Sequence, residues 1–377
     1  MNRAFGEAEA AFDWVKHHLR KRRDPGIYHV QPYRGHGTAD SLYVSGRVFE
    51  GVPIPAARAD DAYLRNLWHT MQRLSRDDVP AARVCATVNG VTKTVLADDE
   101  GFFEAHLPVS TTPGAGELWR EIEIELVDPV PADGPLAVQG FSIVPPAEAR
   151  FGIISDIDDT VVETDVANLL RMMRLVLLTN AHTRLPFAGV AAFYRALHRG
   201  AAGAFTNPIF YVSSSPWNFY DLLTEVFEVH DIPLGPLFLK DYGLARDLLL
   251  SRGHVEHKLS AIDSIFDTHP RLPFVLVGDS GQKDPEVYCE AVRRHPGRVS
   301  AIYIRDVSRT ERDAEVEALA AEVERLGAEM VFVTDTVAAA EHAATRGFID
   351  FSELAEIRGE SESDRAAPGP IEAILRK

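Results

Sequence analysis

Carboxylates, serines and a lysine follow short apolar segments in the second half of the chain. The segment DIDDT, residues 156–160, follows FGIIS, the segment SSSP, residues 213–216, follows PIFYV, and GDSGQKD, residues 278–284, follows PFVLV. Lys258 lies between the last two segments. A phosphate ester is polyanionic and repels nucleophiles, so its chemistry requires a screening cation and a positioned attacking oxygen. These residue types could supply both.

The elements around these polar segments predict an α/β domain. From Arg150 onward, short wholly apolar strands alternate with helical stretches at about 217–228, 284–295, 311–326 and 336–345. Apolar strands of this kind are covered on both faces in a parallel sheet. We therefore expect a doubly wound parallel sheet. Ligands of such sheets bind at the carboxyl ends of the strands, where the polar segments fall.

The preceding part of the chain has a different pattern, which divides the chain into regions. Residues 27–146 contain alternating strand-like runs broken by turn signals, and they predict a β-sandwich with a helix at about 62–74. An N-terminal helix with a basic end is expected at 1–26. The α/β domain is expected at 150–356, with an insertion at about 165–207, and a flexible polar tail at 357–377.

The order of the polar segments resembles that of the haloacid dehalogenase-like phosphohydrolases. DxDxT after a strand, a serine at a strand end, a lysine and GDxxxxD all occur in the family's order. The resemblance implies that Asp156 is the covalent nucleophile and that Asp158 is the general acid and base. An acidic residue at the second position favours phosphate transfer to water over dehalogenation.

The same resemblance implies a Mg²⁺ site and a phosphate-binding pair. Asp156, Asp279 and the main-chain carbonyl of Asp158 would bind Mg²⁺, with Asp284 supporting them. Ser213 would donate to a phosphate oxygen and Lys258 would offset the accumulated negative charge. The choice of Ser213 over Ser214 depends only on its position directly after the apolar strand, so both remain open.

A narrower resemblance comes from the segments around the motifs. ISDIDDTVVETDV, TRLPFAGVAAFYRAL, YVSSSPWNFYDLL, LKDYG, HKLSAI and VGDSGQKDPEVY are similar to the phosphatidate phosphatase family typified by the yeast actin-patch-associated enzyme, a lipin-related family. This implies Mg²⁺-dependent conversion of phosphatidate to diacylglycerol and phosphate. Two alternatives stay open: a phosphatase for a soluble phosphomonoester, and a non-catalytic scaffold.

The insertion and three isolated cations leave the substrate open. The apolar segments LLRMMRLVLL and LPFAGVAAFY could form an acyl-chain groove or a small helical cap packed on the core. Lys240, Arg246 and Arg305 are candidates for binding a second charged group of the substrate, and each could equally be an ordinary surface cation.

Composition limits the class of partner. A net charge of −17 argues against nucleic-acid binding, which requires neutralisation of phosphates by Lys and Arg. The sequence has no signal-peptide pattern, and we expect a cytoplasmic protein. The basic run at residues 16–23 could make a peripheral contact with anionic lipid, or it could complement a helix dipole in solvent. Cys85 and Cys289 are expected to be core thiols.

Two other motif matches fail on inspection. DIDD is not a calcium loop, because Val161 and Ala167 stand where glycine and glutamate are required. HVEHK, residues 254–258, lacks the order of a zinc-binding helix, so its histidines are expected at the surface.

Overall fold

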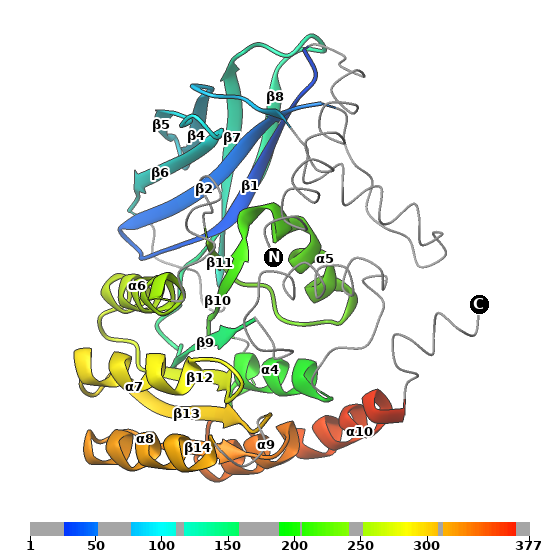
Figure 1. The fold of residues 1–377 in the computed structure, drawn as a ribbon. Helices are drawn as coiled ribbons and strands as arrows, with labels where there is room; N and C mark the ends of the chain where they lie inside the picture. Colours follow the sequence, from blue (N-terminus) through cyan, green and yellow to red (C-terminus); the bar gives the residue numbers. More distant parts are fainter. Residues whose placement is uncertain are drawn as a thin grey trace, which may run out of the picture.

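The protein was examined as a computed structural model that describes residues 26–51, 77–110, 117–157, 188–203, 206–240, 252–307 and 312–366. These residues form an N-terminal β-sheet region and a C-terminal α/β region (Figure 1). The predicted helices at 1–26 and 62–74 lie almost wholly outside the described residues. No helix within the described part of the chain is long and apolar enough to cross a membrane.

The β-sheet region contains strands β1 to β8. Their bounds are β1 Tyr28–Gly37, β2 Ser41–Glu50, β3 Asp77–Asp78, β4 Arg83–Val88, β5 Val91–Leu96, β6 Phe102–Pro108, β7 Trp119–Asp128 and β8 Leu136–Ile143. Alternation determines which face is buried: in β7, Ile122, Ile124 and Leu126 face the core while the glutamates between them are exposed. The predicted all-β region is confirmed.

The strands of the predicted β-sandwich are continuously paired. The strand order is β3-β2-β1-β8-β7-β4-β5, with β6 paired to β2, so all eight strands belong to one sheet. The link is β1, which pairs with β2 along its length and with β8 in parallel near its end. The sheet curls around one apolar core built from β1, β2, β4, β6, β7 and β8 (Figure 1).

The α/β region is built on a six-stranded parallel sheet, as the apolar segments predicted. Its order is β11-β10-β9-β12-β13-β14. The strands are β9 Gly152–Asp156, β10 Ile209–Pro216, β11 Leu237–Lys240, β12 Phe274–Asp279, β13 Val299–Arg305 and β14 Met330–Val333. The edge strand β11 was not predicted, because its four residues are too few to show a pattern.

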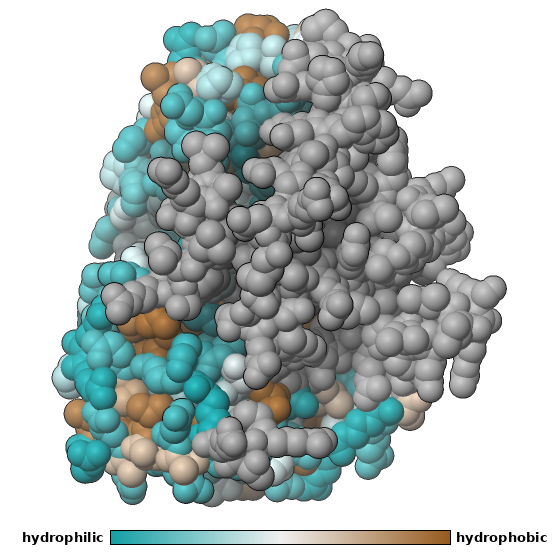
Figure 2. Space-filling model, in the orientation of Figure 1, coloured by the Kyte–Doolittle hydropathy of each residue, from teal (hydrophilic) through white to brown (hydrophobic). Residues whose placement is uncertain are grey.

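Helices cover both faces of this sheet. α6 Arg252–Thr268, α7 Asp284–Arg294 and α8 Asp313–Arg325 pack on one face. α4 Val190–Arg199, α5 Tyr220–Val229, α9 Thr336–Thr345 and α10 Glu353–Ala366 contribute to the core on the other face. The α/β class and the parallel sheet are confirmed. On the side seen in Figure 2, the described surface is largely hydrophilic, with small separate hydrophobic patches.

The predicted flexible tail is wrong for its first ten residues. α10 continues to Ala366, and Ile357 and Ser361 on it are buried. The helix docks on α4, whose first amide groups have no partner within the helix. Asp364 Oδ2 accepts a hydrogen bond from Gly189 N at 2.8 Å, and Glu360 Oε1 accepts one from Ala192 N at 2.8 Å. Residues 367–377 lie outside the described part.

The predicted insertion at 165–207 also requires correction at its end. The segment from residue 188 belongs to the α/β core, because α4 buries Phe193, Tyr194 and Leu197 in that core. Of the two interpretations of LPFAGVAAFY, packing on the core is therefore the one seen for the part after residue 187. Residues 158–187, with the rest of the insertion, are not described.

Candidate functional site

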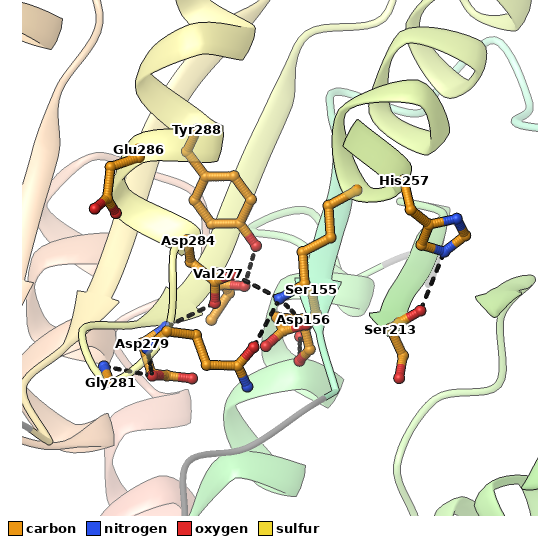
Figure 3. A network of polar contacts seen from close by, with 12 residues as sticks. Ser155, Asp156, Ser213, His257, Val277, Asp279, Gly281, Asp284, Glu286 and Tyr288 are labelled. Atoms are coloured by element: carbon orange, nitrogen blue, oxygen red, sulfur yellow. Dashed lines mark hydrogen bonds and ion pairs between the residues drawn. The ribbon is translucent and has the colours of Figure 1, made fainter. Parts of the chain in front are cut away.

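The carboxyl ends of three neighbouring strands bring the predicted site residues together. β9 is flanked by β10 and β12, and its last residue, Asp156, pairs with Val212 of β10, directly before Ser213. On the other side Val277 of β12 pairs with Ser155, which places Asp279 two residues further along the same edge. Figure 3 shows Asp156 between Ser213 and the Asp279–Asp284 pair.

Lys258 reaches this edge from α6. The helix buries Leu259, Ile262, Ile265 and Phe266 against the sheet, and this packing turns the neighbouring Lys258 toward the strand ends. Its ammonium Nζ lies 2.8 Å from Asp156 Oδ1 and 2.7 Å from Asp284 Oδ1. Nζ also donates to Gln282 Oε1 at 3.2 Å. The lysine thus joins the end of β9 to the loop after β12.

The loop after β12 is held by its two aspartates. Asp279 Oδ1 accepts hydrogen bonds from Gly281 N at 2.7 Å and from Gln282 N at 3.1 Å. Asp284, on the first turn of α7, uses Oδ2 to accept from Asp279 N at 3.1 Å. Gly278 permits this approach, because a Cβ there would lie 2.6 Å from Asp284 Oδ2. Both oxygens of Asp284 are therefore engaged by the protein, which suits a supporting role.

The site concentrates negative charge in a buried place. Oxygens of Asp156, Asp279 and Asp284 lie within 4.8 Å of one another, and Lys258 is the basic side chain seen to pair with them. Burial and the neighbouring Asp284 carboxylate raise the pKa of Asp279 to about 7, although its hydrogen bonds and Lys258 act in the opposite direction. Oxygen ligands with excess negative charge fit a hard divalent cation.

Ser213 is fully buried at the end of the apolar part of β10. Its hydroxyl accepts a hydrogen bond from Ser215 N at 3.0 Å. His257 Nε2 lies 3.2 Å from the Ser213 carbonyl oxygen. His257 is half-buried and packs against the strand end, so the expected surface location holds for it only in part. Ser214 is half-buried, and the choice between the two serines stays a prediction.

A hollow opens beside Asp156 between α4 and α9. Asp156, Asp279 and Arg305 contribute its charged lining together with Asp335. The rest of the wall is mainly apolar or aromatic: Val190, Phe193, Tyr194, Val277, Gly278, Tyr303, Val333, Thr336 and Ala339. Tyr194 also contacts β9 directly before Asp156, with its hydroxyl 2.6 Å from Ser155 Oγ. The hollow can accept an apolar group adjoining the carboxylates.

The predicted residues divide into those brought together and those not described. Asp156, Lys258, Asp279 and Asp284 form one connected cluster, and Ser213 ends the adjacent strand. Asp158 and Arg246 lie outside the described residues. Lys240 is buried at the end of β11, and Arg305 pairs with Asp279 in the strand register.

Sequence reasoning missed three contributors to this site. Gln282 lies within GDSGQKD, but nothing in that motif indicated its contact with Lys258. His257 directly precedes Lys258, and this position could have indicated that His257 lies near the site. No sequence signal pointed to Arg312. Its Nε donates to Ser280 O at 2.6 Å and its Nη2 donates to Gln282 O at 2.5 Å, so Arg312 stabilises the loop after β12.

Comparisons with known proteins agree with this location. Residues 151–306 match the family model described as "Phosphatidate phosphatase APP1, catalytic domain". The chain is 36% identical over 163 residues to phosphatidate phosphatase APP1 of Saccharomyces cerevisiae, an alignment that covers 43% of this chain and 27% of that protein. It is 24% identical over 265 residues to an uncharacterized protein of Schizosaccharomyces pombe, covering 67% of this chain and 42% of that one.

The extent of these matches limits what they imply. The chain spans 27% and 42% of the lengths of these two relatives. Among solved structures, a carbohydrate acetylesterase from Xanthomonas citri aligns with 80% of this chain and 75% of its own at 12% identity. Its TM-score is 0.26, which carries no argument about fold or function.

Proposed function

We propose that this chain is a phosphoric monoester hydrolase that converts phosphatidate to diacylglycerol and phosphate, because residues 151–306 match the family model of the phosphatidate phosphatase APP1 catalytic domain. The observation that carries the proposal is the buried cluster of Asp156, Lys258, Asp279 and Asp284 at one edge of the parallel sheet. The proposed architecture is haloacid dehalogenase-like, supported by the order of the motifs and the sheet.

The proposed reaction proceeds in two steps at Asp156. The Asp156 carboxylate attacks phosphorus, the bond from phosphorus to the glycerol oxygen breaks, and Asp158 donates a proton to the departing oxygen. Asp158, now a carboxylate, then takes a proton from a water whose oxygen attacks phosphorus of the aspartyl-phosphate. Phosphate leaves and Asp156 is regenerated. Ser213 donates to a phosphoryl oxygen throughout, and Lys258 offsets the charge shared by Asp156 and the phosphoryl group.

Mg²⁺ fits the donor set of this site. Asp156 and Asp279 would supply carboxylate ligands together with the main-chain carbonyl of Asp158, and Asp284 would hold Lys258 and the Asp279 loop in place. When bound, the cation would screen the phosphate charge. Its positive charge would also lower the pKa of Asp279, against the effects of burial and of Asp284, because a nearby positive charge favours the ionised carboxylate.

The lipid assignment is supported by the match of residues 151–306 to the phosphatidate phosphatase family model. The hollow next to Asp156 has a largely apolar wall, which suits a small apolar portion of a substrate close to the phosphate ester, but it is too small for an acyl chain. A soluble phosphomonoester is the alternative, because the hollow also contains Arg305, which could bind a second charged group. A non-catalytic scaffold is disfavoured by the presence of Asp156, Asp279, Asp284 and Lys258 at one place.

The test is phosphate release from phosphatidate micelles and from para-nitrophenyl phosphate, each with Mg²⁺ or EDTA. Asp156→Asn is the inactive variant, and Asp267→Asn, an exposed position on α6, is its matched control. Release from phosphatidate that EDTA and Asp156→Asn both abolish supports the lipid assignment. Release from the soluble ester alone rejects it and keeps the mechanism. A folded wild-type protein inactive on both substrates contradicts the proposed activity.

A further inference from the structure

The β-sheet region contacts the strand that bears Ser213 at both of its ends. His36 of β1 lies near Phe210, the second residue of β10, with ring centroids 6.3 Å apart. Tyr33 of β1 stacks on Trp217, the first residue after β10, at 4.4 Å and an interplanar angle of 23°. The two aromatic contacts therefore bracket the strand.

The contacts beyond the strand end are concentrated on one short stretch, residues 217–221. This stretch comprises the single-turn helix η1 Trp217–Phe219 and the start of α5. Arg34 N donates to the Tyr220 hydroxyl at 2.8 Å, and the Gln31 side-chain amide donates to Asp221 Oδ1. A three-residue helix has little stability of its own, so its position depends on these tertiary contacts.

Arg47 of β2 is the most firmly held of the contacting residues. It is buried, its Nε donates to Glu100 O at 2.8 Å, and its Nη2 pairs with Asp78 Oδ1 at 2.8 Å. The guanidinium also lies over the Phe102 ring, 4.3 Å from its centroid. The remaining arm, Nη1, donates to Asn218 Oδ1 at 2.7 Å. A side chain fixed from three directions within the β-sheet region thus holds a residue five positions after Ser213.

We propose that the β-sheet region is a positioning element for the phosphate-binding end of β10, and that Arg47 is a positioning residue acting through Asn218. The inference rests on the proposed function, which assigns Ser213 to the phosphoryl group. Its physical basis is the steep dependence of catalysis on placement, since a displacement of about 1 Å can cost roughly a hundredfold in rate. Arg47 does not touch substrate.

The test compares Arg47→Met and Arg47→Lys with two variants at Asn218, which is exposed and can be replaced without opening a core. Asn218→Leu removes the acceptor for Nη1, whereas Asn218→Asp keeps one. Arg83→Met, at an arginine paired with Asp128 on the far part of the β sheet, is the matched control. The readouts are kcat and KM on the substrate that wild type turns over, inhibition by inorganic phosphate, and amide hydrogen exchange of residues 213–219.

We expect Arg47→Met and Asn218→Leu to lower kcat/KM and phosphate affinity by about tenfold or more at temperatures where both are folded. Amide hydrogen exchange at residues 213–219 should become faster in these two variants. Asn218→Asp and Arg83→Met should keep kcat/KM, phosphate affinity and exchange close to the wild-type values. A lowered melting temperature with wild-type kcat/KM and unchanged exchange overturns the proposal. If Arg47→Met fails to fold, the results for Asn218→Leu decide whether the proposal holds. If the wild-type protein shows no activity, the proposed function is refuted. The hydrogen-exchange measurement then tests the positioning role of the β-sheet region by itself.

Discussion

Replacing Lys258 with methionine should destabilise the chain far more than loss of an ordinary cation. The Lys258 side chain is 6% exposed, and its two partners, Asp156 and Asp284, are 3% and 0% exposed. Removing one partner of a buried ion pair costs about 3–5 kcal/mol, because the other charge stays buried without compensation. Two carboxylates lose their partner here, so we expect a fall in unfolding free energy toward the upper end of that range at neutral pH.

The loss should depend on pH and on Mg²⁺. Lys258 lowers the pKa of Asp279, so its removal should raise that pKa further, and protonation of Asp279 should narrow the stability gap between wild type and Lys258→Met as the pH falls from 7.5 to 5. Added Mg²⁺ should restore part of the lost stability, because it would bind the folded state and supply positive charge there.

Urea unfolding followed by circular dichroism measures this loss, with EDTA or Mg²⁺ at each pH. Lys283→Met is the control, because Lys283 is 62% exposed and pairs with Glu286 on the surface at 2.9 Å. A surface pair contributes about 0–1 kcal/mol. If Lys258→Met stays within about 1 kcal/mol of the control at pH 7.5, or shows no change between the two pH values, the electrostatic description of the site is refuted.

Three further changes test separate parts of the structure. The folded pKa of Asp279, about 7, exceeds its usual 3.8, so the metal-free protein should lose stability as the pH rises through that interval. Asp279→Asn should remove this loss and also the gain from Mg²⁺ in thermal melts. Burial and then His106 lower the pKa of His36 from 6.5 to about 4, so stability should fall as the pH drops through that interval. His36→Phe should recover about 3 kcal/mol of this loss in urea titrations, and an unchanged pH profile would contradict the assignment. Gly278→Ala places a Cβ 2.6 Å from Asp284 Oδ2 and should reduce phosphate release about a hundredfold, whereas near-normal activity would show that the loop can shift.

The sequence was most informative where local pattern and chemistry coincide. The runs FGIIS, PIFYV and PFVLV are apolar on both faces, and they became β9, β10 and β12 in the centre of the parallel sheet. Because parallel strands end at a common edge, the residues after them could be grouped in advance. Asp156, Asp279, Asp284 and Lys258 do form one cluster.

Features that depend on contacts between distant segments could not be predicted. α10 is polar along much of its length, GESESDR included, and its order depends on capping α4 across more than 160 residues of chain. The hydrogen bond from Arg47 to Asn218 spans 171 residues and follows no local pattern. The pairing of β1 with both β2 and β8, which joins the strands into one sheet, also depends on contacts between distant segments.

The described fold extends well past residue 306, where the family match ends, and this matters for any attempt to shorten the protein. A fragment ending there would lose α8, β14, α9 and α10 and would leave β13 as an open edge strand. β13 has buried Ala301, Ile302, Tyr303 and Ile304, and a long apolar edge of this kind promotes aggregation by pairing with other chains. If such a fragment were insoluble, the cause would be the edge strand that the truncation exposes. A minimal fragment that contains the candidate site should therefore run to at least Ala366.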